Sequence, residues 1–211
     1  MGLITAIVPD RKDPTRTIIK VDGRSVATVS QASIRELGIR ENQPWDTQLA
    51  VQVAEAAKVD CAHRAAMQRL NRRALTTAQL ASKLYRLGYA AATVQRVCRR
   101  LQQIGALDDE AFGRSLIREL QDRKPAGPRL LRQKLLQRGI EQSLIDRLIT
   151  ESLDTADPRT TAIELARRKL PLLERHDPKT RKKRLWGMLQ RRGFDEETIQ
   201  EVLEEVGNSC S

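Results

Sequence analysis

A glycine recurs three times in this chain in nearly the same apolar setting, as Gly88, Gly139 and Gly193, with gaps of 51 and 54 residues. Apolar side chains stand at six fixed offsets around it: eight and four residues before, and one, six, nine and ten residues after. In offset order they are Leu80, Leu131 and Leu185; Leu84, Leu135 and Leu189; Tyr89, Ile140 and Phe194; Val94, Ile145 and Ile199; Val97, Leu148 and Val202; and Cys98, Ile149 and Leu203. A period of about 50 residues is typical of proteins that stack one supersecondary unit several times.

Each repeat is predicted to contain three helices, because apolar residues recur at the three- and four-residue spacing of a helix with one buried face. The expected helices span residues 62–73, 78–87 and 91–104, then 110–123, 129–138 and 142–153, then 159–173, 179–192 and 196–206. The repeated glycines should end the middle helices with a positive φ. Helix caps are expected at Thr76-Thr77, Asp108, Asp157, Asp177 and Asp195, and Pro171 should bend or end its helix.

The N-terminal residues instead predict strands. Two β-branched runs, residues 17–21 and 24–29, flank Asp22-Gly23, which is a strong hairpin signal, and residues 4–8 could add a third strand. Ser30 should cap a short helix that Gly38 ends, and a turn is expected at residues 42–45. The predicted organisation is a β-hairpin extension with a short helix (1–46), a linking helix (47–60) and three-helix repeats at 61–107, 108–156 and 157–211, the last with a frayed C-terminus.

The net charge of +11 is concentrated in one segment. Residues 61–107 carry nine basic and no acidic residues, whereas residues 1–60 and 108–156 are each balanced and residues 157–211 are at +2. A surface of one sign on this scale suggests a polyanion or an acidic protein surface as partner. The chain lacks a run of about 18 apolar residues, and its start does not resemble a signal peptide. No membrane contact is therefore expected. The three cysteines, Cys61, Cys98 and Cys210, are odd in number and share no metal-binding spacing, which favours the reducing cytoplasm.

The candidate contact residues are arginines and lysines of all three repeats. They are Arg72, Arg73, Lys83, Arg86, Arg96, Arg99 and Arg100; Arg129, Arg132, Lys134 and Arg138; and Lys182, Lys183 and Arg191. In the second and third repeats, ion pairing within the chain is an equally good interpretation, whereas the first repeat offers no acid locally. Tyr85 could stack on bases, while Tyr89 falls on a core position.

Nothing in the sequence predicts an enzyme, a cofactor or a metal site. Asp108-Asp109-Glu110 could hold Mg²⁺ in a nuclease, but such a cluster is more typical of a helix N-terminus. His63 and His176 are isolated, and neither a nucleophile elbow nor a glycine-rich phosphate loop is present.

Three stretches resemble the RecX family of bacterial regulators of the RecA recombinase. They are Gly105-Ala-Leu-Asp-Asp-Glu-Ala-Phe112, the segment from Lys124-Pro-Ala-Gly-Pro-Arg to Gln-Arg-Gly-Ile140, and Met188-Leu-Gln-Arg-Arg-Gly-Phe-Asp-Glu-Glu-Thr-Ile199. The resemblance covers about residues 61–206 in the order of three repeats, and the leading hairpin resembles an extension found in part of the family. Gly113 departs from it, since the family usually has alanine there.

This resemblance implies a mostly α-helical protein in which three tandem helix-turn-helix-like repeats form an elongated, curved array. It implies a monomer that lodges in the groove of a RecA filament on single-stranded DNA, with double-stranded DNA as a further candidate partner. There it would hinder ATP hydrolysis, strand exchange and filament growth, and so regulate DNA repair, recombination and the SOS response. The alternative from another class is a DNA-binding transcription factor built from helix-turn-helix units.

Overall fold

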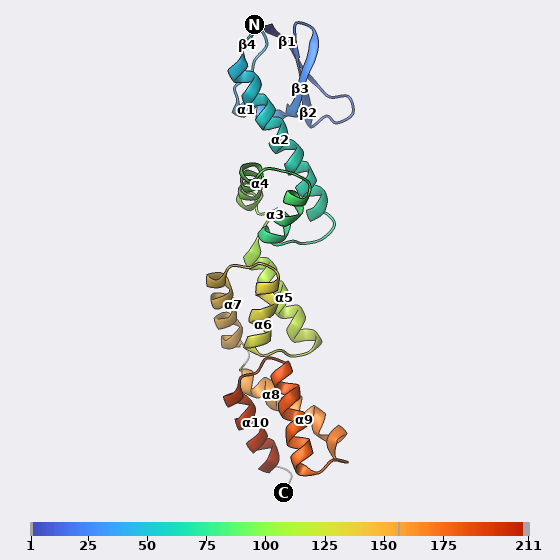
Figure 1. The fold of residues 1–211 in the computed structure, drawn as a ribbon, viewed down its shortest axis with the longest axis vertical. Helices are drawn as coiled ribbons and strands as arrows, with labels where there is room; N and C mark the ends of the chain where they lie inside the picture. The colour runs from blue at the N-terminus through green and yellow to red at the C-terminus, as the bar shows by residue number, and fades with distance from the viewer. Residues whose placement is uncertain (1, 156, 209–211) are drawn as a thin grey trace. The chain divides into compact units, whose positions relative to one another are not determined.

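The computed structural model describes residues 2–155 and 157–208 (Figure 1). The chain divides into two compact units: the chain up to Ala74 together with Leu80–Leu107, and Leu75–Gln79 together with the chain from Asp108 onward. Cys210 lies outside the described residues, as does most of the tail that was expected to fray. No helix in the described part of the chain is long and apolar enough to cross a membrane.

The first unit begins with a small antiparallel sheet. Strands β1 (Gly2–Pro9), β2 (Arg16–Val21), β3 (Arg24–Ser30) and β4 (Pro44–Trp45) lie in the order β3-β2-β1-β4. Asp22 and Gly23 both have positive φ, 49° and 79°, which suits a tight hairpin and confirms that prediction. The turn expected at residues 42–45 is partly wrong, because Pro44 and Trp45 pair with β1. Two residues are too few to show a strand period in the sequence.

Two helices follow the sheet. Helix α1 (Gln31–Glu36) is capped by Ser30 and followed by Gly38 at φ 61°, as predicted. Helix α2 (Thr47–Leu70) is one continuous helix, although separate helices were expected on the two sides of residues 60 and 61. No glycine or proline interrupts it. Its first half buries Leu49 and Val53 in the core of the sheet, and its second half packs on α4.

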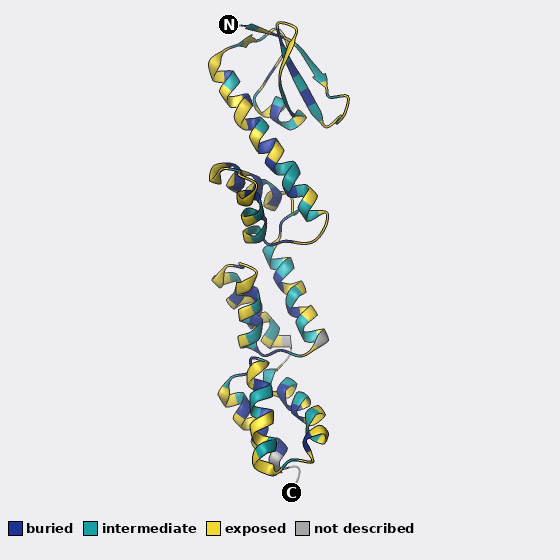
Figure 2. Cartoon of the chain, turned by 45° about the vertical axis from the view of Figure 1, so that its right-hand side comes forward, coloured by how far each residue is buried: buried dark blue, intermediate teal, exposed yellow. Residues whose placement is uncertain are grey.

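The three-helix repeats form as predicted, and each contains buried residues of its own, dark blue in Figure 2. These buried residues are mostly apolar. The first consists of the end of α2, α3 (Thr77–Arg86) and α4 (Ala91–Gln103). The second contains α5 (Asp109–Arg123), α6 (Pro128–Gln137) and α7 (Gln142–Thr155). The third contains α8 (Pro158–Lys169), the 3₁₀ helix η1 (Leu170–Leu173), α9 (Pro178–Arg191) and α10 (Glu196–Asn208). Helix α8 changes to η1 between Lys169 and Leu170, next to Pro171, where an interruption was expected.

Each repeated glycine adopts the left-handed conformation that the sequence predicted. The φ angles are 84° at Gly88, 76° at Gly139 and 81° at Gly193. In each case the middle helix of the repeat ends just before the glycine. The next residue turns back into the repeat, and both Ile140 and Phe194 are buried.

In the second unit, the turns at Gly139 and Gly193 each dock on the start of an earlier middle helix. The hydroxyl of Thr76 donates to the carbonyl of Arg138 at 2.6 Å, and the amide of Gly127 donates to the carbonyl of Arg192 at 2.8 Å. Thr76 and Gly127 both stand twelve residues before a repeated glycine, so the two contacts are equivalent. We call this arrangement the glycine junction.

Candidate anion-binding interface

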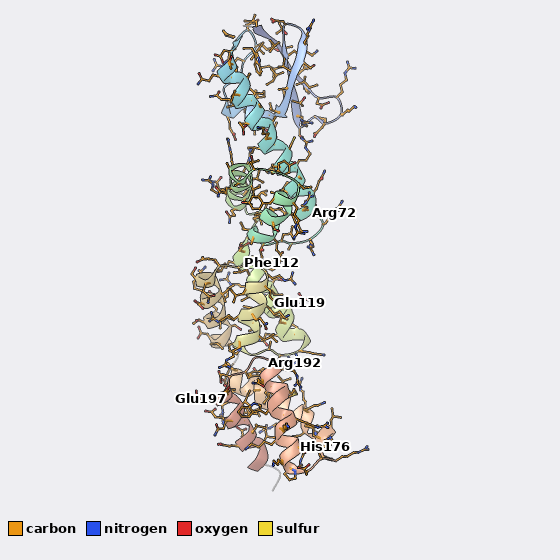
Figure 3. The ribbon with its side chains drawn as sticks, viewed as in Figure 1. Arg72, Phe112, Glu119, His176, Arg192 and Glu197 are labelled. Carbon is orange, nitrogen blue, oxygen red and sulfur yellow. The ribbon has the colours of Figure 1, made fainter. Side chains whose placement is uncertain are left out.

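The basic side chains of the first repeat lie on its helices and loops, mostly in contact with solvent. Arg72 and Arg73 follow the end of α2 (Figure 3), and Arg86 lies on the last turn of α3. All three are exposed, whereas Lys83 is half-buried. Within the described residues none of these four takes part in an ion pair, so their charges are available to a partner.

Three arginines gather on α4. Arg96, Arg99 and Arg100 line a hollow of about 450 Å³ together with Val59 and Gln103, and we call these three the α4 arginine cluster. They share the exposed side of the helix, opposite the buried Val97 and Leu101.

The sequence did not reveal a carboxylate that faces this cluster. Glu36, at the end of α1, lies with its carboxylate oxygens 3.7 Å from both Arg96 Nη2 and Arg100 Nη1. Residues 61–107 contain no acid of their own, but the fold brings Glu36 from outside the repeat to face α4. These atoms are too far apart for good hydrogen bonds and are partly exposed, so the pairing is weak.

A buried carboxylate fixes the position of α1, and with it Glu36. Asp60, in the middle of α2, accepts the backbone amide of Ser30 at 2.5 Å and the hydroxyl of Ser33 at 3.0 Å. His63 lies one turn after Asp60 on α2. Burial lowers the pKa of its imidazole, and the nearby charge of Arg100 lowers that pKa further. The imidazole next to the cluster is therefore held toward its neutral form.

In the second repeat, ion pairing accounts for part of the predicted contact set. Arg132 pairs with Asp146, and Lys134 Nζ donates to Gln137 Oε1 at 3.4 Å. Arg129 and Arg138 make no ion pair within the described residues. Their backbones instead form glycine junctions, since the Arg129 amide donates to the Gly193 carbonyl at 3.0 Å.

In the described part of the third repeat, the arginines of α8 are paired with acids, whereas the cations of α9 are not. Arg159 on α8 pairs with Glu201 and Glu205 of α10 at 3.0 and 2.8 Å, and Arg167 pairs with Glu205 at 3.3 Å. No cation of α9 forms an ion pair in the part of the chain that the structure describes. Lys182, Lys183 and Arg191 are exposed on that helix. Pairing within the chain therefore explains the arginines of α8, not the cations of α9.

Comparison with known proteins gives the family. Family models for the second and third three-helix domains of RecX match residues 108–149 and 157–203. The chain is 31% identical over 144 residues to the regulatory protein RecX of Chlorobium phaeobacteroides (strain BS1), covering 68% of this chain and 92% of that protein. The RecX of Chlorobaculum tepidum is 34% identical over 141 residues, or 67% and 85% of the two chains. This chain belongs to the RecX family.

Solved structures show the same fold. A crystal structure of regulatory protein RecX aligns with a TM-score of 0.83 at 20% identity, over 97% of this chain and all of that one. RecX from Lactobacillus salivarius aligns with a TM-score of 0.62 at 16% identity, over 71% and 97% of the two chains. The mostly helical fold, with three-helix units after a small sheet, is thus that of RecX proteins. The regulatory role follows from the family itself, through relatives such as the Chlorobium phaeobacteroides protein.

The departure from the RecX pattern at Gly113 has a packing reason. Gly113 is buried in α5, and a Cβ there would overlap Leu148 and stand 3.4 Å from Ile140. Phe112, half-buried beside it (Figure 3), fills the neighbouring part of the same core. This RecX core therefore has no room for alanine at residue 113 unless Leu148 moves.

The acidic cluster at the start of α5 has three separate structural partners. Asp108 accepts the Ala111 amide at 2.8 Å as the helix cap, and Asp109 accepts the Thr77 amide at 2.7 Å. Glu110 is 2.6 Å from Arg114, and hydrogen bonds from Arg147 and Arg114 lower its pKa. No group of three His, Cys, Asp or Glu that could hold a metal occurs among the described residues.

The two tyrosines of the first repeat differ in exposure. Tyr85 is 47% exposed, while Tyr89 is half-buried at the position that Ile140 and Phe194 occupy in the other repeats. The Tyr85 ring is therefore accessible to a partner, whereas part of the Tyr89 side chain is covered by its own repeat.

Proposed function

We propose that this RecX-family chain binds the RecA filament on single-stranded DNA and hinders ATP hydrolysis, strand exchange and filament growth. It would thereby regulate DNA repair, recombination and the SOS response. It would act as a cytoplasmic monomer without enzymatic activity or cofactor. Family membership supports the regulatory part of this proposal, and the exposed cations support the contact with DNA and with an acidic protein surface.

The α4 arginine cluster is the observation that carries the proposal. Guanidinium groups bind phosphate through paired hydrogen bonds and stay charged at every physiological pH. Arg96, Arg99 and Arg100 offer three such groups around one hollow, and Glu36 is the carboxylate that lines it. Because Glu36 is held at 3.7 Å and partly exposed, a phosphate group can take its place at small cost.

Co-sedimentation with RecA filaments on oligothymidylate tests the proposal, with the rate of ATP hydrolysis as the second readout. The wild-type chain should sediment with filaments and lower that rate. Changing Arg96, Arg99 and Arg100 together to alanine should weaken binding and flatten its salt dependence, since each lost phosphate contact reduces the slope by about 0.7 on single strands.

A charge-matched control comes from the same unit. Arg11, Arg24 and Arg40 are exposed, and their side chains make no hydrogen bond or ion pair in the described structure. Changing these three to alanine removes the same charge but should leave binding nearly intact. Equal losses in both triple variants would contradict a specific role for the cluster. A sequence-specific footprint on duplex DNA without RecA would favour a transcription factor instead.

A further inference from the structure

The third repeat carries a cationic groove along α9. A hollow of about 900 Å³ lies between η1 and α9, and we call it the α9 groove. Its cations are Lys169, Lys183, Arg184, Arg191 and Arg192, and no carboxylate lines it. Arg192 (Figure 3) donates to the Lys124 carbonyl at 3.3 Å, and none of the five forms an ion pair in the described structure.

The groove is also apolar, which separates it from an ordinary solvated face. Leu172, on η1, is 70% exposed at its edge, and Leu173 and Met188 line it further in. Gly187 also lines the groove, and the Arg191 guanidinium lies over it, 3.2 Å from where a Cβ would stand. No aromatic ring lines the groove, whereas surfaces that bind single-stranded nucleic acid usually offer rings on which bases stack.

The position of the groove within the repeat indicates what kind of group fits it. Lys183 and Arg184 stand ten and nine residues before Gly193. The residues ten before the earlier glycines are Ala78 and Arg129, and those nine before are Gln79 and Leu130. A Cβ on Gly139 would lie 2.5 Å from that of Ala78, and one on Gly193 would lie 2.5 Å from that of Leu130, so a chain turn docks there in both cases. On the third repeat, Lys183 and Arg184 at these positions line the α9 groove.

We propose that the α9 groove binds an acidic peptide segment that carries an apolar side chain. Carboxylates would face the five cations, and the apolar side chain would cover Leu172 and Met188. The α9 positions that line the groove run from Thr180 to Arg192, about 18 Å along the helix, which an extended segment of about six residues spans.

This inference goes beyond the proposed filament binding, and a peptide assay tests it without RecA or DNA. The probe is a fluorescently labelled synthetic peptide of glutamates with a central leucine, added to the full chain at physiological ionic strength. The wild-type chain should bind it. Replacing the peptide leucine by serine, or its glutamates by glutamine, should each weaken binding at least about fivefold.

Matched variants locate the site. Lys183→Glu with Arg184→Glu should weaken peptide binding about tenfold or more. Lys179→Glu with Lys182→Glu changes the net charge equally on exposed positions of the same helix outside the groove, and should cost about twofold or less. Leu172→Ser should weaken binding about fivefold without a change in charge. Because these side chains are exposed, thermal melts should show that all the variants are folded. If the Lys183→Glu, Arg184→Glu variant is unfolded, the milder Lys183→Gln with Arg184→Gln takes its place.

Two results would overturn the inference. Equal weakening by both charge-reversal pairs would mean that net charge alone attracts the peptide and that the groove is a solvated face. If Leu172→Ser left peptide binding unchanged while oligothymidylate displaced the peptide, the groove would be a nucleic-acid surface instead.

Discussion

The side-chain hydroxyl of Thr76 donates a 2.6 Å hydrogen bond to the backbone carbonyl of Arg138, 62 residues further along the chain. The same hydroxyl accepts the Gln79 amide at 3.2 Å and so caps α3. The Thr76 hydroxyl therefore gives a hydrogen-bond partner both to an amide in the first turn of α3 and to a carbonyl at the end of α6. Each of these backbone groups would otherwise lack an intrahelical partner. This double role is specific to the junction at Gly139, since at Gly193 the backbone amide of Gly127 makes the equivalent contact.

The first prediction compares two glycines with the same backbone conformation. Gly88 and Gly139 have φ angles of 84° and 76°, but a Cβ on Gly88 would meet nothing within 4 Å, whereas one on Gly139 would overlap Ala78. Gly88→Ala should therefore cost only the backbone strain, about 1–2 kcal/mol. Gly139→Ala should cost about 1–3 kcal/mol more because the junction is overpacked. Urea unfolding gives the free energies, and equal losses would show that the junction adds nothing.

The second prediction concerns Thr76 itself. Thr76→Val keeps the shape but leaves the Arg138 carbonyl and the Gln79 amide without their partner, and should lower the free energy of unfolding by about 1–2 kcal/mol. Thr76→Ser keeps the hydroxyl and should retain most of that stability. Amide hydrogen exchange should show lost protection in α3 and at the end of α6 for the valine variant. If serine and valine behave alike, the hydroxyl has no part in the junction.

Much of the fold could be predicted because its signals are local. A left-handed residue at a helix end strongly favours glycine, so Gly88, Gly139 and Gly193 mark three helix ends. The apolar offsets around them mark the core, and Leu80, Leu131 and Leu185 are all buried. Side-chain caps are equally local, and Asp108, Asp157, Asp177 and Asp195 each accept an amide two or three residues ahead.

The site was less predictable because its charges meet through the tertiary fold. Glu36 is 60 residues before Arg96 in the sequence. Only the packing of α1 within the first unit brings the Glu36 carboxylate to 3.7 Å from the Arg96 guanidinium. In the same way, the sequence of the third repeat does not reveal that the acids of α10 pair with α8 and leave α9 unpaired. The α9 groove was also missed, because the apolar and cationic residues that line it come from α8, η1 and α9 and meet only in the folded repeat.

The third prediction concerns the start of α5. Asp108→Asn keeps an oxygen that can accept the Ala111 amide and should be nearly neutral, while Asp108→Ala should cost roughly 0.5–2 kcal/mol. Chemical denaturation of the two variants checks this difference. The regulatory effect on RecA should survive in Asp108→Asn. Loss of that effect at unchanged stability would instead point to a functional carboxylate.

The fourth prediction concerns Glu36 as a competitor for the α4 arginine cluster. Glu36→Gln removes the carboxylate that faces Arg96 and Arg100, so binding of oligothymidylate should strengthen about two- to fivefold at low salt. Glu55→Gln is the control, since Glu55 is an exposed acid of the same unit that pairs with Lys58 and lies outside the hollow. Fluorescence anisotropy measures both affinities. An equal gain in the two variants would mean that only net charge matters.

The last prediction is an acid-sensitive third repeat. Asp157, Asp177 and Asp195 cap its three α-helices, and hydrogen bonds from Thr160, Thr180 and Thr198 lower their pKa values below the usual 3.8. The unfolded chain therefore binds these protons more readily than the folded one. The stability that the three carboxylates contribute is complete above about pH 5 and is lost as the pH falls through their lowered pKa values. Thermal melts followed by the fluorescence of Trp186, in a chain with Trp45→Phe, should show this loss as the pH falls below about 4. Asp177→Asn, which keeps a cap but cannot titrate, should make the decline shallower. A decline of unchanged steepness in Asp177→Asn would show that this cap does not set the acid response of the repeat.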